Sequence, residues 1–259
     1  MPLPSIIKAE ALTPSQLASW TEEPIVAFLG SAISIWAPTN LPTGKAFSKA
    51  IFRALFHESG RVKDPLGEEQ LEKLFSKIPF EIVMEQCPDP QTLTTLLTDI
   101  FRITEYNDIH RLFAESLIND RVAAVVTTNY DCCIERAIAD VVGCPVGSSM
   151  GPVKRVTADR DWNSRVAERL YFKIHGSADD PSSESLVFRL RQESVLPSWK
   201  RSLLESVIKD RTLLLLGYSG LDFEIFRYFI LPVYFGMCSA KRKSHPKPEP
   251  FLRRREAQS

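Results

Sequence analysis

The stretch that decides the fold is Val125-Val126-Thr127-Thr128-Asn129-Tyr130-Asp131, in which an apolar run ends in polar residues just before a helical pattern. A short, continuous apolar run is typical of a buried strand in a parallel sheet. In α/β proteins, small ligands bind in the crevice beyond the carboxyl ends of such strands. Asn129 and Asp131 are therefore candidate site residues.

Three further apolar runs end in the same way. We expect strands over 25–29, 170–174 and 212–216, in addition to 123–127. The segments that follow these three are Gly30-Ser31-Ala32-Ile33-Ser34, His175-Gly176-Ser177 and Gly217-Tyr218-Ser219-Gly220-Leu221-Asp222. Strands that each end in small or polar residues predict an α/β fold, a Rossmann-like parallel sheet flanked by helices.

The remaining segments are mostly helical in pattern. Residues 45–119 show helical spacing interrupted by prolines, and we interpret them as an inserted helical lobe that covers the cleft. Other helices are expected near Thr13 and over 131–141, 196–209 and 223–229. Residues 143–165 lack a clean period and predict a loop, whereas 185–189 predict a short edge strand.

Composition limits the classes of function. The chain has 259 residues, and 32 Lys and Arg balance 32 Asp and Glu, so no net field favours nucleic acid or an anionic membrane. No signal-peptide core and no membrane-length apolar run stand out, which predicts a cytoplasmic protein without membrane contact. The five cysteines include no C-x-x-C pair, which argues against a disulfide framework and a zinc ribbon.

The domain organisation follows from the same pattern. Residues 1–238 predict one domain, and 239–259 predict a basic, proline-rich tail that is disordered. A role in nucleic-acid binding would have to be indirect or use this tail. A chain cut from a larger architecture is an equal alternative to a slightly short fold, because the expected last strand and helix are missing from the pattern.

Each motif alone has an ordinary explanation. Small residues after the first strand would allow a pyrophosphate to approach the backbone, but they are also typical of an ordinary connection from a strand to a helix. Asn129 could be a turn residue, and Asp131 and Asp222 could cap helices. It is the co-occurrence of such residues at four strand ends that favours a functional site.

In this order, the four segments resemble the SIR2-like family, the sirtuin-related NAD-binding fold found as an effector domain in bacterial anti-phage defence proteins. The resemblance covers about residues 24–230. It implies that Asn129 holds the nicotinamide ribose and the attacking water, that His175 is the base, and that Asp131 recognises the nicotinamide carboxamide. The other residues that it implies for NAD binding are Gly30, Ser31, Ala32 (in place of the usual glycine), Ser34, Gly217, Ser219 and Asp222.

The function implied by the resemblance is NAD⁺ glycohydrolysis, an NAD⁺ nucleosidase reaction that gives nicotinamide and ADP-ribose and depletes NAD during infection. NAD would be the substrate, with no metal, and a homo-oligomer or a defence partner or sensor protein is expected. The alternative is a module that senses NAD or ADP-ribose, or binds a partner, without turnover. Sirtuin-type protein deacylation would have to proceed without the zinc module, because no pair of C-x-x-C motifs lies between His175 and Gly217. This alternative is therefore disfavoured.

Overall fold

The protein is built on a five-stranded parallel sheet with the strand order β3-β4-β2-β1-β5. The computed structural model describes residues 25–58, 66–78, 80–87, 89–102, 105–145, 150–162, 169–180, 186–188, 196–209, 211–219 and 225. The strands are β1 (Ile25–Leu29), β2 (Val122–Thr127), β3 (Lys154–Val156), β4 (Leu170–Lys173) and β5 (Thr212–Leu216). The predicted α/β class and parallel sheet are therefore confirmed.

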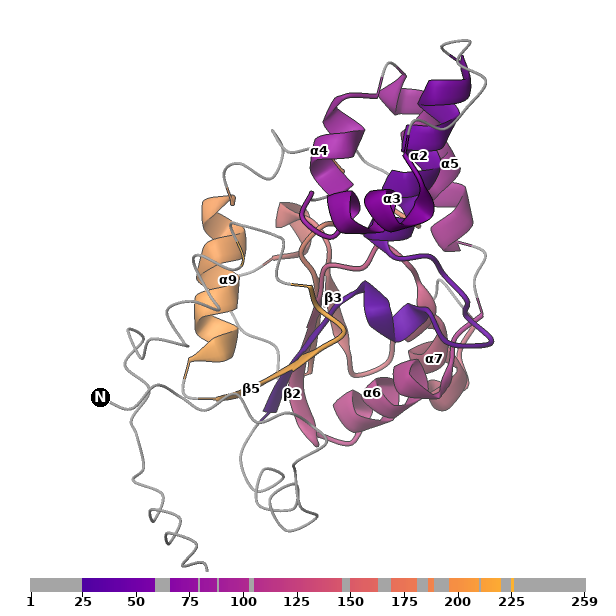
Figure 1. Ribbon diagram of the computed structural model, residues 1–259. Coiled ribbons are helices and arrows are strands. Elements are labelled where there is room, and N and C mark those ends of the chain that lie inside the picture. The colour runs from indigo at the N-terminus through magenta and orange to yellow at the C-terminus, as the bar shows by residue number, and fades with distance from the viewer. Residues whose placement is uncertain are drawn as a thin grey trace, which may run out of the picture.

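Helices cover both faces of the sheet (Figure 1). The apolar runs are continuous because both faces of each strand are covered. In β1, Val26 and Phe28 face one helical layer, and Ala27 and Leu29 face the other. The first layer is α9 (Ser198–Ile208), which contributes Leu203, Leu204 and Val207. The second layer comprises α6 (Asp108–Ile118) and α7 (Cys133–Val142), which contribute Phe113, Leu117, Ile134 and Ile138.

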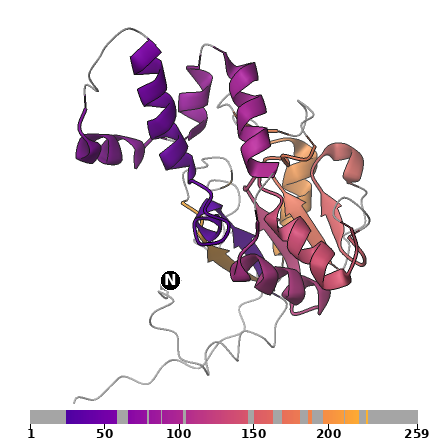
Figure 2. The same cartoon turned by 90° about the vertical axis from the view of Figure 1, so that its right-hand side faces the viewer.

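Four of the helices between β1 and β2 form a separate group beyond one end of the sheet (Figures 1 and 2). They are α2 (Gly44–Glu58), α3 (Glu68–Phe75), α4 (Phe80–Glu85) and α5 (Pro90–Arg102). We call these four helices the helical lobe. Helix α6 was expected in the same lobe, but its Phe113 and Leu117 pack into the sheet core instead. A third apolar cluster, with Leu97, Phe101 and Tyr130 among its members, joins the lobe to the body.

Two elements differ from the sequence prediction. Residues 143–165 are not a continuous loop, because they contain β3 and the short 3-10 helix η3 (Asp159–Asp161). Strand β3 has only three residues, two of them charged, and so gives no apolar run; pairing with β4 defines it. The expected edge strand over 185–189 is absent from its described part, 186–188, where Val187 N–H only donates to His175 O (3.0 Å).

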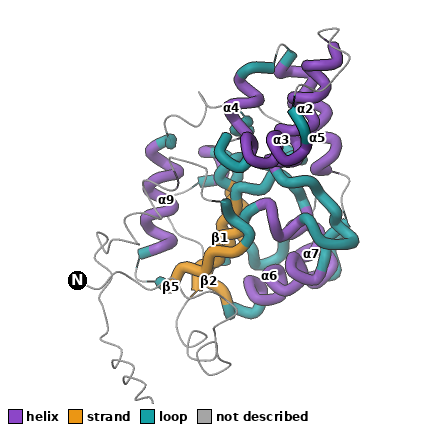
Figure 3. The backbone as a smooth tube through the Cα atoms, in the orientation of Figure 1, coloured by secondary structure: helices purple, strands orange, loops and turns teal. Residues whose placement is uncertain are grey.

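Boundaries otherwise move by a few residues. Strand β4 ends at Lys173 rather than 174, and α7 begins at Cys133 rather than 131. The tube in Figure 3 shows the loops that follow the strand ends, where the candidate site residues lie. The helices expected near Thr13 and over 223–229, and the tail 239–259, fall outside the described residues apart from Ile225. The domain boundary at 238 stays a prediction.

The ends of β1 and β5 approach so closely that only glycine fits. Gly30 N–H donates to Leu216 O (2.9 Å), and Ala32 N–H donates to Gly217 O (3.1 Å). A Cβ on Gly30 would lie 2.5 Å from Gly217 O and from Tyr218 Cα, both of which are backbone atoms. Gly217 itself has a φ of 67°, which disfavours side chains. These two glycines set the relative position of two strand ends.

Replacing Gly30 by alanine should therefore destabilise the protein. We expect Gly30→Ala to lower the free energy of unfolding by about 2 kcal/mol or more, because the backbone must move to relieve the overlap. The matched control is Gly67→Ala, whose Cβ would meet nothing closer than 3.9 Å and which should cost less than about 1 kcal/mol. Urea unfolding measures both, and equal losses in the two variants would contradict the account.

Candidate functional site

A cavity of about 500 Å³ lies between the carboxyl ends of the strands and the helical lobe. It is the place that the sequence predicts for a ligand. The predicted residues that line it are Ser31, Ala32, Ser34, Asn129, Asp131, His175, Gly217 and Ser219. Gly30 lies directly behind the cavity wall against Gly217, and Asp222 lies outside the described residues. The fold thus brings segments from four strand ends into one cavity.

Asn129 is held with its amide in a defined orientation. The residue is 7% exposed, and Nδ2 donates toward Ser34 Oγ (3.3 Å), Asp131 Oδ2 (3.3 Å) and Gly30 O (3.4 Å). The carbonyl and the carboxylate can only accept, so the nitrogen must occupy this side of the amide. Asn129 Oδ1 has no hydrogen-bond partner among the described residues. A buried acceptor of this kind is suited to a ligand hydroxyl or a water.

Thr127 fixes the backbone that carries Asn129. Its Oγ1 donates to Leu29 O (2.9 Å) at the end of β1 and accepts from Asn129 N–H (3.0 Å). The hydroxyl therefore joins the ends of β1 and β2 and sets the start of the Asn129 turn. The sequence alone gives Thr127 no role, because a threonine in an apolar run is also an ordinary strand residue.

Asp131 caps a helix and also supports the site. Its Oδ1 accepts from the N–H of Cys133, the first residue of α7 (3.2 Å). Its Oδ2 accepts from Ser34 Oγ (2.9 Å) and from Asn129 Nδ2. The geometry therefore shows the helix cap. The carboxylate also lines the cavity, and its contact with a ligand stays a prediction.

His175 lies on the same cavity wall at the end of β4. The residue is 5% exposed, and its ring centroid is 6.1 Å from that of Tyr130. Tyr130 is fixed in turn, because its hydroxyl donates to Val187 O (2.5 Å) and its ring packs 4.3 Å from Phe188. His175 and Asn129 come from neighbouring strands, β4 and β2, which pair in parallel.

The lobe supplies the opposite wall, which the sequence did not assign in detail. Four of its aromatic residues line the cavity, Phe47, Phe75, Phe80 and Phe101. The rings of Phe47 and Phe101 lie 5.5 Å apart, and Phe101 lies 5.5 Å from Tyr130. Lys45 is the only lysine or arginine among the lining residues that the structure describes. One apolar wall therefore faces one polar wall, as in many small-molecule sites.

Comparison with known families agrees with this geometry. Residues 123–230 match the SIR2-like domain. The match includes Asn129, Asp131, His175 and Gly217, and it confirms the predicted resemblance over that range. SIR2-like domains bind NAD, so the match supports an NAD-related function. No curated protein matched the chain. No helix of the described part is long and apolar enough to cross a membrane.

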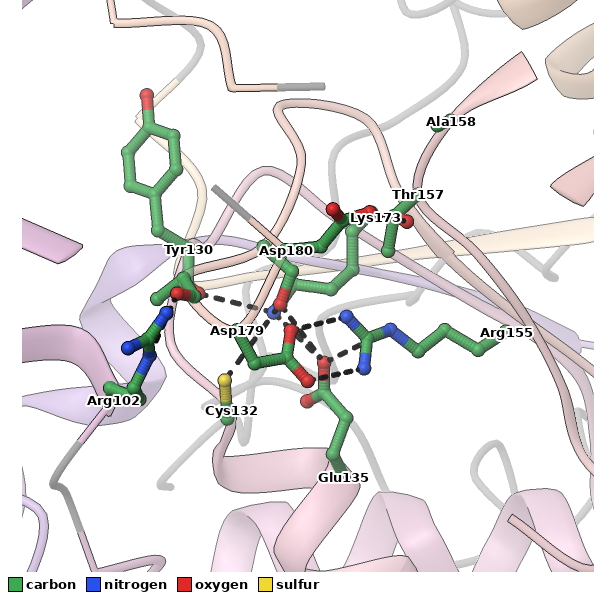
Figure 4. A network of polar contacts seen from close by, with 12 residues as sticks. Arg102, Tyr130, Cys132, Glu135, Arg155, Thr157, Ala158, Lys173, Asp179 and Asp180 are labelled. Atoms are coloured by element: carbon green, nitrogen blue, oxygen red, sulfur yellow. Dashed lines mark hydrogen bonds and ion pairs between the residues drawn. The ribbon is translucent and has the colours of Figure 1, made fainter. Parts of the chain in front are cut away.

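A buried lysine anchors the polar wall of the cavity (Figure 4). Lys173 is 0% exposed, and its Nζ donates to the carbonyl oxygens of Tyr130 (3.2 Å) and Asp131, to Ser177 Oγ (2.8 Å) and to Glu135 Oε1 (3.0 Å). Burial alone would lower the pKa of Lys173, but the charge of Glu135 and smaller contributions from Cys132 and Asp131 together raise it. The charged lysine therefore connects β4 to the turn that carries Asn129.

Charge compensation continues outward from Glu135. Arg155 on β3 lies 3.7 Å from Glu135 and forms two hydrogen bonds with Asp179, one of 2.6 Å. Tyr171 donates its hydroxyl to the second Glu135 oxygen (3.0 Å). Burial alone would raise the pKa of Asp179, but hydrogen bonds and charge from the Arg155 guanidinium lower it below its usual range. The two buried charges, Lys173 and Glu135, are thus paired and hydrogen-bonded, as burial requires.

Two groups of described residues bring possible metal ligands within 4.8 Å of one another. They are His110, Asp131 and Cys133, and Cys132, Glu135 and Asp179. The carboxylates of the second group already pair with Lys173 and Arg155. Burial raises the pKa of the Cys132 thiol to about 11. In the first group, Cys133 Sγ donates to Glu105 O (3.8 Å). Hydrogen bonds and ion pairs explain both groups.

Removing the buried ammonium should destabilise the domain strongly. We expect Lys173→Met to lower the free energy of unfolding by about 3 to 5 kcal/mol, because Glu135 and two carbonyl groups lose their buried partner. Urea unfolding is the measurement.

The double variant Lys173→Met/Glu135→Gln provides the control for this prediction. Because it removes the uncompensated charge as well, it should recover at least about 1 kcal/mol of the loss. A Lys173→Met variant as stable as the wild type would show that the ammonium does not anchor the turn.

Proposed function

We propose that the protein is an NAD⁺ glycohydrolase that converts NAD⁺ and water to nicotinamide, ADP-ribose and a proton. The observation that carries this proposal is the buried Oδ1 of Asn129, which has no hydrogen-bond partner within the described part of the chain and lies in the same cavity as His175. The SIR2-like match supports NAD as the ligand class. By resemblance, we further propose that the enzyme depletes NAD as an effector in anti-phage defence, controlled by self-association or by a partner or sensor protein.

The reaction breaks the bond between the nicotinamide nitrogen and C1′ of the ribose. The electron pair of that bond leaves with nicotinamide, and the ribose passes through an oxocarbenium-like state that water attacks. Asn129 Oδ1 is the acceptor that would hold the attacking water or a ribose hydroxyl. An amide can do this without adding charge to the site.

His175 would take the proton during the same step. An imidazole is the side chain best suited to accept a proton from water or a hydroxyl near neutral pH. His175 and Asn129 lie in the segments that follow two adjacent strands, β4 and β2, so both could reach the same ribose. Asp131 would hold Asn129 in place, since its Oδ2 accepts from Nδ2. A direct contact of Asp131 with the carboxamide remains a proposal from the resemblance.

The aromatic wall would receive the planar nicotinamide ring and keep bulk water away. Phe101 and Tyr130 lie beside the polar groups, so a ring packed on them would lie near His175. Desolvation strengthens the electrostatic interactions of the site and limits side reactions. Ser31, Ala32, Gly217 and Ser219 line the part of the cavity near the β1 and β5 ends, where we propose that the rest of the dinucleotide binds.

Nicotinamide release from NAD⁺ by the purified protein tests the function. We expect the wild type to release nicotinamide, and Asn129→Ala and His175→Ala to lower kcat by about 100-fold or more. The matched control is Asn119→Ala, an exposed asparagine at the end of α6, which should keep the wild-type rate.

The outcome also separates the alternative functions. NAD⁺ or ADP-ribose binding without any release, in the presence of the physiological activator, would contradict the enzyme and favour a sensor or partner-binding module. Release of nicotinamide only when an acylated peptide is present would favour deacylation.

Lys45 should contribute to substrate binding rather than to chemistry. Its ammonium pairs with Glu72, and Lys49 Nζ also pairs with Glu72 (2.8 Å). Hydrogen bonds from the two lysines lower the pKa of Glu72 to about 2, so the carboxylate is ionised. Lys45 can turn toward a diphosphate while Lys49 keeps Glu72 paired.

We therefore expect Lys45→Gln to raise KM for NAD⁺ by about 5- to 10-fold with little change in kcat. Lys49→Gln is the matched control, because Lys49 shares Glu72 but does not line the cavity. Steady-state kinetics at several salt concentrations measures the effect. Equal KM values for both variants would show that Lys45 does not bind the substrate.

A further inference from the structure

The hydroxyl of Ser34 joins three side chains behind the cavity wall. It donates to Asp131 Oδ2 (2.9 Å), and it lies 3.1 Å from His110 Nε2 and 3.3 Å from Asn129 Nδ2. A hydroxyl has one hydrogen and two lone pairs. Because its hydrogen goes to Asp131, Ser34 must accept from both His110 and Asn129, so all three of its positions are used.

The tautomer of His110 follows independently from its other ring nitrogen. The backbone N–H of Asn107, which can only donate, points to His110 Nδ1 (3.2 Å). The hydrogen of the neutral ring must then be on Nε2, which faces Ser34. His110 is 0% exposed. Burial lowers its pKa, although the carboxylates of Asp131 and Glu135 act in the opposite direction, and this favours the neutral ring.

The start of α6 is held against the segment that carries Ser34. Asn107 Nδ2 donates to Ile33 O (2.9 Å), and its Oδ1 accepts from the N–H groups of Ile109 (3.1 Å) and His110 (3.3 Å). The residue that caps α6 therefore also contacts the residue before Ser34. This arrangement fixes the position of the His110 ring relative to the Ser34 hydroxyl.

We propose that His110 is a positioning residue that, through Ser34, holds the Asn129 amide with Oδ1 toward the cavity. The proposal rests on the glycohydrolase function and adds a residue that does not line the cavity. The donated hydrogen bond fixes Ser34 as an acceptor for Asn129 Nδ2. Without it, only the bond to Asp131 orients the Ser34 hydroxyl, and one of the long bonds that orient the Asn129 amide is weakened. The expected effect is on kcat, because Asn129 acts on the reacting groups.

Two substitutions at His110 separate this role from simple packing. The side-chain nitrogen of Gln can stand in for Nε2 and keeps a donor for Ser34. Asn instead places an acceptor near Nδ1 for the Asn107 N–H and leaves Ser34 without its donor. We expect His110→Asn to lower kcat about 10- to 100-fold with KM within about 3-fold, and His110→Gln to keep kcat within about 3-fold.

Thermal unfolding midpoints of both variants provide the reference. If kcat merely follows the midpoint, or if the two variants lose kcat equally, the positioning role is overturned. In a Ser34→Ala background, His110→Asn should cause no further loss of kcat, because the intermediate group is gone. A full additional loss in that background would also overturn the proposal.

An activity-independent measurement keeps the two proposals distinguishable. In proton–nitrogen correlation spectra of histidine-labelled protein near neutral pH, the ring absent from the His110→Asn spectrum should be protonated only at Nε2. The opposite tautomer, or a doubly protonated ring, would overturn the role of His110 whether or not NAD⁺ is cleaved. Absence of nicotinamide release by the activated wild type would instead overturn the glycohydrolase function.

Discussion

The buried ammonium of Lys173 is the interaction on which the polar wall of the cavity depends. It lies at the end of β4, two residues before His175, and binds the carbonyl groups of Tyr130 and Asp131 in the turn after β2. Glu135 supplies the compensating charge from α7. Breaking a buried pair of this kind is costly, because the remaining charge loses its closest cation; Glu135 would keep only the more distant Arg155 (3.7 Å). The interaction therefore fixes His175 relative to Asn129.

The same wall is rigid for a second reason. Thr127, Ser34 and Asp131 surround Asn129 with hydrogen bonds, while Gly30 and Gly217 hold the ends of β1 and β5 together. The opposite wall comes from the lobe and carries four aromatic residues. A preorganised polar wall facing an apolar wall suits a reaction in which charge develops on a ribose and a neutral ring departs.

The sequence predicted the parts of the structure that depend on local patterns. Continuous apolar runs identified β1, β2, β4 and β5, because strands covered on both faces show no alternation. Strand β3 escaped prediction, since its three residues become a strand only through pairing with β4. The sequence also pointed to Asn129 and His175, which lie in one cavity because parallel strands end on the same edge.

The supporting residues could not be predicted in the same way. In the sequence, Lys173 looks like an ordinary polar residue at the end of a strand. Its partner Glu135 is 38 residues away in the sequence, so only the fold brings them together. His110 lies on a helix with ordinary helical spacing, and its bond to Ser34 spans 76 positions. A buried lysine or histidine among apolar residues is a signal of such a network, but only the fold identifies the partners.

The central claim is that Asn129 Oδ1 receives the ribose or the attacking water. A crystal structure of the protein with ADP-ribose tests it most directly. We predict a ribose hydroxyl, or a water bound to it, within hydrogen-bond distance of Asn129 Oδ1, with the diphosphate near Ser31 and Lys45. ADP-ribose bound outside this cavity, or with Asn129 Oδ1 still unpartnered, would contradict the account.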